Sequence, residues 1–99
     1  MFVFEDIVYL EDRTIQNILK DVDQRDLVMA LKSVNEEVQA KIYKNISIRA
    51  ATIIREEMDY TGPVKLKDVE TAQQNILDII RKKEETGEIQ LTKGTEEFV

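Results

Sequence analysis

Carboxylates, lysines, tyrosines and hydroxyls are the side chains that remain for chemistry in this sequence, because its 99 residues include no cysteine and no histidine. The chain therefore has no thiolate nucleophile, no thiolate zinc site and no histidine general base. Glu56 and Glu57 form an adjacent acidic pair, but neighbouring helix positions point about 100° apart and do not converge on one substrate atom. Gly-rich phosphate loops and the HExxH and EF-hand spacings are also missing. We expect no enzyme, no cofactor and no metal site.

The charge balance narrows the kinds of partner. Lys plus Arg is 14 and Asp plus Glu is 20, which gives a net charge of −6. A duplex nucleic-acid binder or a polybasic membrane-surface module needs a cationic face, so neither fits. No apolar run approaches the length of about 18 residues that a membrane span requires. The sequence predicts one cytoplasmic domain without direct membrane insertion, in which a binding or mechanical role is favoured over catalysis.

Helix signals run through most of the chain. Glycine occurs three times and proline once, and apolar residues recur at helical spacing. Asp12, Asp23, Asn35 and Ser47 are placed to act as N-caps. We expect an all-α fold, a compact bundle or short superhelix of five to six helices, with a short extended segment at 88–91 that closes the core. The expected helical segments are a short turn at 4–10 and helices at 12–22, 23–34, 35–45, 47–60 and 67–86.

The predicted helix at 47–60 has its charges reversed relative to the helix dipole. Acidic side chains stabilise a helix N-terminus and basic ones a C-terminus. Here Arg49 lies in the first turn, whereas Glu56, Glu57 and Asp59 lie in the last, and Arg49, Glu56 and Tyr60 share the outward face. Each mismatch costs about 0.3–1 kcal/mol when exposed. Rules of this kind are broken most often at functional sites. A solvated face, partly compensated by Arg55 and Lys65, is the alternative interpretation.

Six short motifs, in order along the chain, resemble the C-terminal part of the FliG family of flagellar motor switch proteins. Each motif is weak alone, but six in register are specific. Ile46 stands where the family usually has Met, Ser33 where Gly is common, and Lys65 where Arg is frequent, with charge signs kept. The matching segments are 1–4 (M-F-x-F), 12–16 (D-R-x-I-Q), 30–32 (A-L-K), 44–51 (N-M-S-x-R-A-A), 62–66 (G-P-V-[RK]-L) and 87–89 (G-E-I).

The resemblance implies a rotor component of the bacterial flagellar motor, with a short right-handed, armadillo-like superhelical fold. Its implied partner is the cytoplasmic loop of the stator protein MotA. FliM and FliN would bind mainly through parts of the family protein missing here, and neighbouring FliG copies would lie in the same ring. The implied location is the cytoplasmic face of the inner membrane, in the flagellar basal body. The charged residues implied in torque generation are Lys32, Arg49, Glu56, Glu57 and Lys65.

The resemblance also implies a division of the chain. Residues 1–4, Met1, Phe2, Val3 and Phe4, would form a hinge for direction switching, 5–92 the stator-facing helical domain and 93–99 a flexible tail. The chain would then be about the last third of the family protein. From the residues alone, the N-terminal apolar segment is either a strap on the core or an edge for docking a partner. A generic module that docks an amphipathic helix is the alternative function, and it predicts an apolar groove with binding insensitive to salt.

Overall fold

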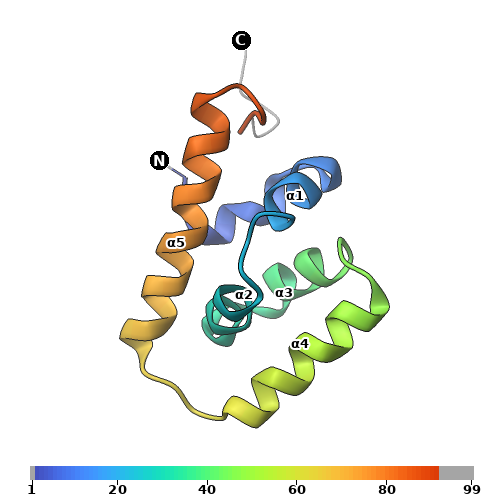
Figure 1. The fold of residues 1–99 in the computed structure, drawn as a ribbon, viewed down its shortest axis with the longest axis vertical. Helices are drawn as coiled ribbons and strands as arrows, with labels where there is room; N and C mark the ends of the chain where they lie inside the picture. Colours follow the sequence, from blue (N-terminus) through green and yellow to red (C-terminus); the bar gives the residue numbers. More distant parts are fainter. Residues whose placement is uncertain (1, 92–99) are drawn as a thin grey trace.

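The computed structural model describes residues 2–91, and the expected all-α fold is confirmed there: the described residues form helices and connecting turns, with no strand. In Figure 1, α5 runs along one side of the molecule, and the shorter helices pack beside it. The predicted tail at 93–99 lies outside the described residues. The elements are the 3₁₀ helix η1 (Phe4–Tyr9), α1 (Asp12–Leu19), α2 (Gln24–Ala30), the 3₁₀ helix η2 (Leu31–Ser33), α3 (Glu36–Tyr43), α4 (Ile48–Thr61) and α5 (Leu66–Glu85).

Three of the four predicted N-caps are confirmed. The side chains of Asp23, Asn35 and Ser47 accept backbone N–H groups at the starts of α2, α3 and α4, at 3.3, 3.0 and 3.0 Å. Such caps satisfy donors that a helix start leaves unpaired. The prediction for Asp12 was wrong: Glu11 is the N-cap residue of α1, and no side chain caps that helix.

The Asp12 carboxylate instead ties α1 to α3. It lies 3.1 Å from the Lys41 ammonium and accepts a hydrogen bond of 3.1 Å from the Asn45 amide. The hydrogen bond from Asn45, followed by that from Lys41, holds the pKa of Asp12 below its usual value. A partner 29 residues or more away in the sequence thus outcompetes the local capping role.

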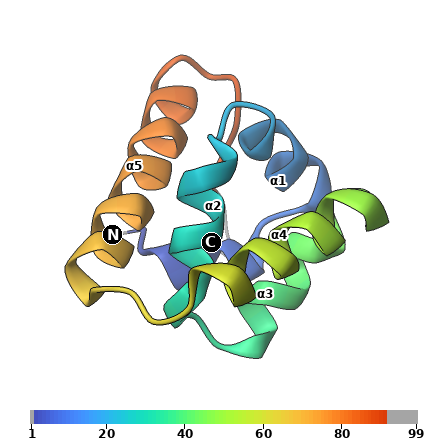
Figure 2. The same cartoon turned by 60° about the horizontal axis from the view of Figure 1, so that its bottom comes forward.

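One hydrophobic core joins all the elements. In α5 the residues that helical spacing places on one inward stripe are Val69, Ala72, Ile76, Ile79 and Ile80; Ile79 is half-buried and the other four are buried, which confirms the stripe. Helix α2 lies between α5 and α4 in Figure 2, and its Leu27, Val28 and Ala30 are buried in the core. Ile89 is buried as well, as the prediction of a core-closing segment at 88–91 requires. The largest fully buried side chains are those of Ile15, Leu31, Val38, Ile42, Ile76 and Ile80.

A buried lysine holds the end of α5. Lys83, only 6% exposed, places its ammonium 2.9 Å from the Asn17 amide oxygen, 3.0 Å from the Glu88 carboxylate and 2.5 Å from the Asp21 carboxylate. The Asp21 and Glu88 carboxylates raise the pKa of Lys83, and Lys83 lowers the pKa of each acid. Helix α1 ends at Leu19, three residues before the predicted end at 22, and Asp21 lies in the turn that follows it.

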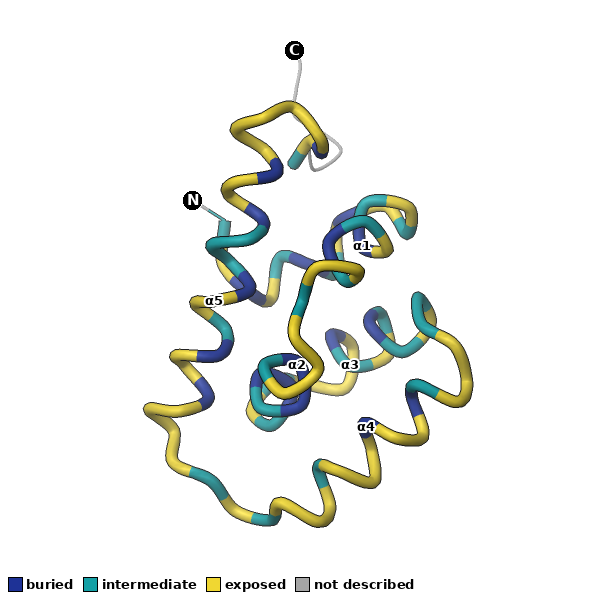
Figure 3. Tube along the Cα trace, in the orientation of Figure 1, coloured by how far each residue is buried: buried dark blue, intermediate teal, exposed yellow. Residues whose placement is uncertain are grey.

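Helix α4 lies at the outside of the fold, along the lower edge in Figure 1. Only Ala51 and Ile54 of its residues are buried, and Figure 3 shows most of its length exposed. It is fastened to α3 by Tyr43, whose hydroxyl donates to the Met58 sulfur at 3.4 Å and whose ring lies 4.1 Å below the Arg55 guanidinium. The side of α4 that faces away from α2 and α3 is exposed to solvent.

Candidate functional site on helix α4

Three of the charges singled out in the sequence share the solvent side of α4. Arg49, Glu56 and Glu57, which we call the α4 ridge, are all exposed. Arg49 and Glu56 are seven residues apart, so they lie on one face about 10 Å from each other along the helix axis, and Glu57 flanks them. Among residues 2–91, no ion pair includes any of the three. The ridge thus presents uncompensated charges of both signs to solvent.

Lys32 is arranged differently from the ridge. It lies on η2, is half-buried, and donates from its ammonium to the backbone carbonyls of Met58 and Gly62, at 2.8 and 2.5 Å. These carbonyls belong to the last turn of α4 and the residue beyond it, where backbone acceptors have few intrahelical partners. A cation there also favours the helix dipole. Lys32 therefore supplies, from another element, the positive charge that the last turn of α4 lacks.

Lys65 is exposed beyond the loop that follows α4. The loop turns at Gly62, whose φ of 65° is a conformation that favours glycine, and Gly62 donates its N–H to the Met58 carbonyl at 3.3 Å. Lys65 is the N-cap residue of α5 and makes no capping hydrogen bond with its side chain. Both exposed cations, Arg49 and Lys65, thus lie at helix N-termini, where the dipole disfavours them. Fold stability does not explain their placement.

Two of the predicted hinge residues, Phe2 and Phe4, pack on the core. Phe4 is 3% exposed, and Phe2 is half-buried against the same cluster, whereas Val3 between them is 44% exposed. Because the side chains of residues 2–4 alternate between covered and exposed, the segment packs on the domain as a strap and is not a free edge for docking. Met1 lies outside the described residues. The structure leaves Phe2 as the residue whose change would disturb the strap without opening the centre of the core.

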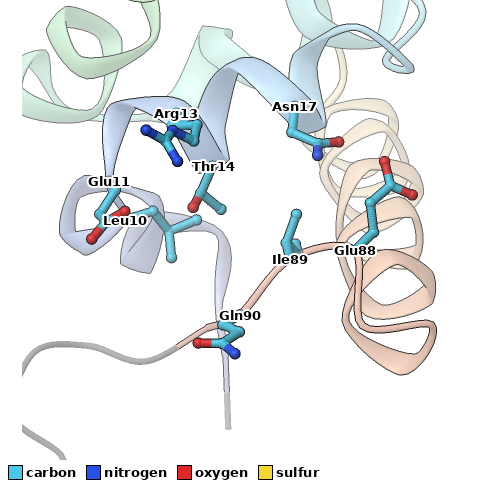
Figure 4. Close-up of a pocket in the computed structure, with 8 residues that line it drawn as sticks. All are labelled: Leu10, Glu11, Arg13, Thr14, Asn17, Glu88, Ile89 and Gln90. Carbon is cyan, nitrogen blue, oxygen red and sulfur yellow. The ribbon is translucent and has the colours of Figure 1, made fainter.

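A polar pocket of about 330 Å³ lies between α1 and the segment 88–90, and none of the predicted site residues lines it (Figure 4). Its two carboxylates, Glu11 and Glu88, lie at opposite sides in the figure. A carboxylic acid that donates protons near neutral pH needs a raised pKa. Lys83 instead lowers the pKa of Glu88. The pocket residues are therefore not arranged as a convergent acid–base pair.

The fold and the ridge define an all-α domain whose outermost helix carries exposed, unpaired charges. In the described part of the chain, no helix is long and apolar enough to cross a membrane, and no group of three or more acidic residues is placed to hold a metal ion.

The chain belongs to the FliG C-terminal domain family, whose profile matches residues 1–91. Flagellar motor switch protein FliG of Thermotoga maritima is 56% identical over 94 residues, which cover 95% of this chain and 28% of that protein. FliG of Borreliella burgdorferi is 54% identical over the whole chain and 29% of its own length. The chain thus spans less than a third of these curated relatives.

Solved structures agree with the family assignment. The crystal structure of FliG residues 116–343 from Helicobacter pylori matches with a TM-score of 0.90 and 46% identity, over 93% of this chain and 40% of that one. Full-length FliG from Aquifex aeolicus matches with a TM-score of 0.84 and 45% identity, over 88% of this chain and 27% of that one. The helical arrangement described above is therefore that of FliG domains.

Proposed function

We propose that this domain is the stator-facing part of a flagellar rotor protein, and that the α4 ridge transmits torque. The observation that carries the proposal is the set of exposed, unpaired charges at Arg49, Glu56 and Glu57 in a member of the FliG family. Lys65 adds an exposed cation beyond the loop, and Lys32 donates a hydrogen bond to the last turn of α4. The proposed partner is the cytoplasmic loop of MotA, which carries charges of both signs. The domain would work in the switch complex at the basal body, on the cytoplasmic face of the inner membrane.

The strength of such contacts suits repeated engagement. An ion pair between exposed side chains contributes about 0–1 kcal/mol, and salt screens it over about 8 Å at physiological ionic strength. Several weak pairs form and break quickly as the stator moves past, whereas one strong pair would hold the rotor in place. The work comes from ion passage through the stator, so the domain needs a rigid charged surface and performs no chemistry itself.

Salt dependence tests this proposal. Titration of the chain with the MotA cytoplasmic loop should give affinity that falls steeply from about 0.1 M to about 1 M NaCl, as the screening length drops from about 10 Å to about 3 Å. A variant with Arg49→Gln, Glu56→Gln and Glu57→Gln should bind weakly and depend much less on salt. Affinity unchanged across the series would instead support the generic module that docks an apolar helix.

Direction switching is the second part of the proposal. We infer that Phe2 and Phe4 anchor a segment that repacks when a signal from FliM reorients the domain, because interfaces of packed apolar side chains favour discrete positions. FliM and FliN would act mainly through other parts of the full protein.

Phe2→Ala tests the switching role, and we expect it to change the fraction of time a tethered motor rotates in each direction while torque stays normal. Phe4→Ala is a poor probe, because truncating a phenylalanine at a fully buried position costs about 3–5 kcal/mol. Val3→Ala, at the exposed position between them, is the matched control and should leave the bias unchanged. If Phe2→Ala motors switch like the parent, the segment is not the hinge.

A further inference from the structure

A groove adjoins the α4 ridge on the side of helix α2. It has a volume of about 480 Å³ and is lined by Val28 and Met29 of α2 and by Glu57 and Tyr60 of α4. Val28 is only 5% exposed and forms part of the floor, whereas Tyr60 is 94% exposed. The sequence predicted that Tyr60 points outward but not that the groove lies beside it, because Val28 and Glu57 are distant along the chain.

Exposed apolar side chains are concentrated on α4 and at the start of α5. Among residues 2–91, six large hydrophobic side chains are exposed, and Ile48, Ile53, Tyr60 and Leu66 of these lie on α4 or at the start of α5. Ile53 and Tyr60 alternate with Arg49 and Glu56 at helical spacing, so they share one face. Tyrosine is enriched at protein interfaces. The exposed face of α4 therefore presents apolar side chains as well as charges.

Two opposite charges flank the groove. Arg25 lines it from α2 and Glu57 from α4, and among the described residues neither side chain takes part in an ion pair. The segment that complements this arrangement has an apolar side chain at its centre, a basic group toward Glu57 and an acidic group toward Arg25. A short amphipathic helix can present these three groups on one face.

We propose that the groove receives an apolar side chain of the same stator segment whose charges face the α4 ridge. This inference rests on the proposed function. Glu57 belongs to both the ridge and the groove, so a segment that pairs with Glu57 lies over the mouth of the groove. The charges steer and orient the encounter, while burial of the apolar side chain against Met29 and Tyr60 supplies short-range attraction that salt does not screen.

Photo-crosslinking in motile cells locates the partner. A full-length FliG carrying this domain would receive a photoreactive phenylalanine analogue in place of Met29 in the groove, Thr52 on the ridge side of α4, or Tyr9 on η1. We expect crosslinks to MotA from the first two positions and none from Tyr9. Crosslinks to MotA from Thr52 but not Met29 would overturn the groove proposal and leave the proposed function standing. If neither Met29 nor Thr52 gave a crosslink to MotA, both the groove proposal and the proposed function would be overturned. Capture of another protein at Met29 would overturn the groove proposal alone.

Truncating Tyr60 measures the apolar contribution. In the titration with the MotA loop, Tyr60→Ala should weaken binding about tenfold, the effect typical of an aromatic anchor, without changing the salt dependence. Tyr9→Ala, at a second exposed tyrosine away from the groove, is the matched control. Affinity equal to that of the parent would contradict the groove proposal, while the salt dependence would still report on the ridge.

Discussion

Reversing the charges of the α4 ridge is expected to abolish torque while leaving the domain at least as stable as the parent. The variant R49E/E56K/E57K inverts every exposed, unpaired ridge charge. Each contact with the stator then changes from attraction to repulsion, and the changes add along one helix face. Swimming and the rotation of tethered cells should both cease at normal protein levels and with normal basal-body assembly.

The stability of this variant should change in the opposite direction from its activity. The substitutions place an acid in the first turn of α4 and bases in the turn before its last, a charge order that the helix dipole favours. Each contributes about 0.3–1 kcal/mol, and repulsion between the new lysines and Lys32 reduces the sum, so we expect the free energy of unfolding to rise by roughly 1 kcal/mol. Urea denaturation measures it. A destabilised variant would show that the ridge acts through the fold rather than through a partner.

Two matched variants separate the ridge from charge in general. D78R/R81D exchanges an exposed ion pair on α5, whose members lie 3.1 Å apart, and should leave motility intact. Arg49→Ala alone should reduce torque only slightly, because distributed weak contacts are redundant. Loss of rotation from Arg49→Ala at normal protein levels would contradict distributed contact. Recovery of the triple variant by a stator loop with reversed charges would identify the pairing directly.

The parts of this fold that sequence predicts well are those set by neighbours along the chain. The stripe that includes Ile76 and Ile80, and the caps at Asn35 and Ser47, depend on residues at most a few positions away, and they are confirmed. Asp12 failed as a cap because Lys41 and Asn45, brought close only by folding, compete for its carboxylate. The contact of Asp21 with Lys83, 62 residues away in the sequence, is of the same long-range kind.

The same limit applies to the candidate site. Exposure of Arg49, Glu56 and Glu57 followed from the helical period, since the buried face of α4 is defined by its own apolar residues. The position of Lys32 against the end of α4 did not, because it lies 26 residues from Met58 and 30 from Gly62. The apparent violation of the dipole rule at the end of α4 is thus partly offset by a residue that periodicity cannot locate.

Lys32 therefore gives the second prediction, in which a residue of the proposed torque set acts chiefly on stability. Lys32→Met keeps the apolar stem and removes the ammonium, so the Met58 and Gly62 carbonyls lose a charged donor. Hydrogen bonds to charged groups contribute about 1.5–3 kcal/mol each, and water recovers part of this in the variant. We therefore expect the free energy of unfolding to fall by about 1–3 kcal/mol. Urea denaturation and thermal melting of the domain measure the loss.

The matched variant is Lys65→Met, which removes an exposed cation from the start of α5. It should leave stability unchanged or raise it by about 0.3–1 kcal/mol, because the dipole disfavours a cation there. Motility of the Lys32→Met strain should recover at lower temperature, and a stator with reversed charges should not restore Lys32→Glu. If Lys32→Met were as stable as the parent and still lost torque, Lys32 would contact the stator directly, because only a lost partner contact would then account for the defect.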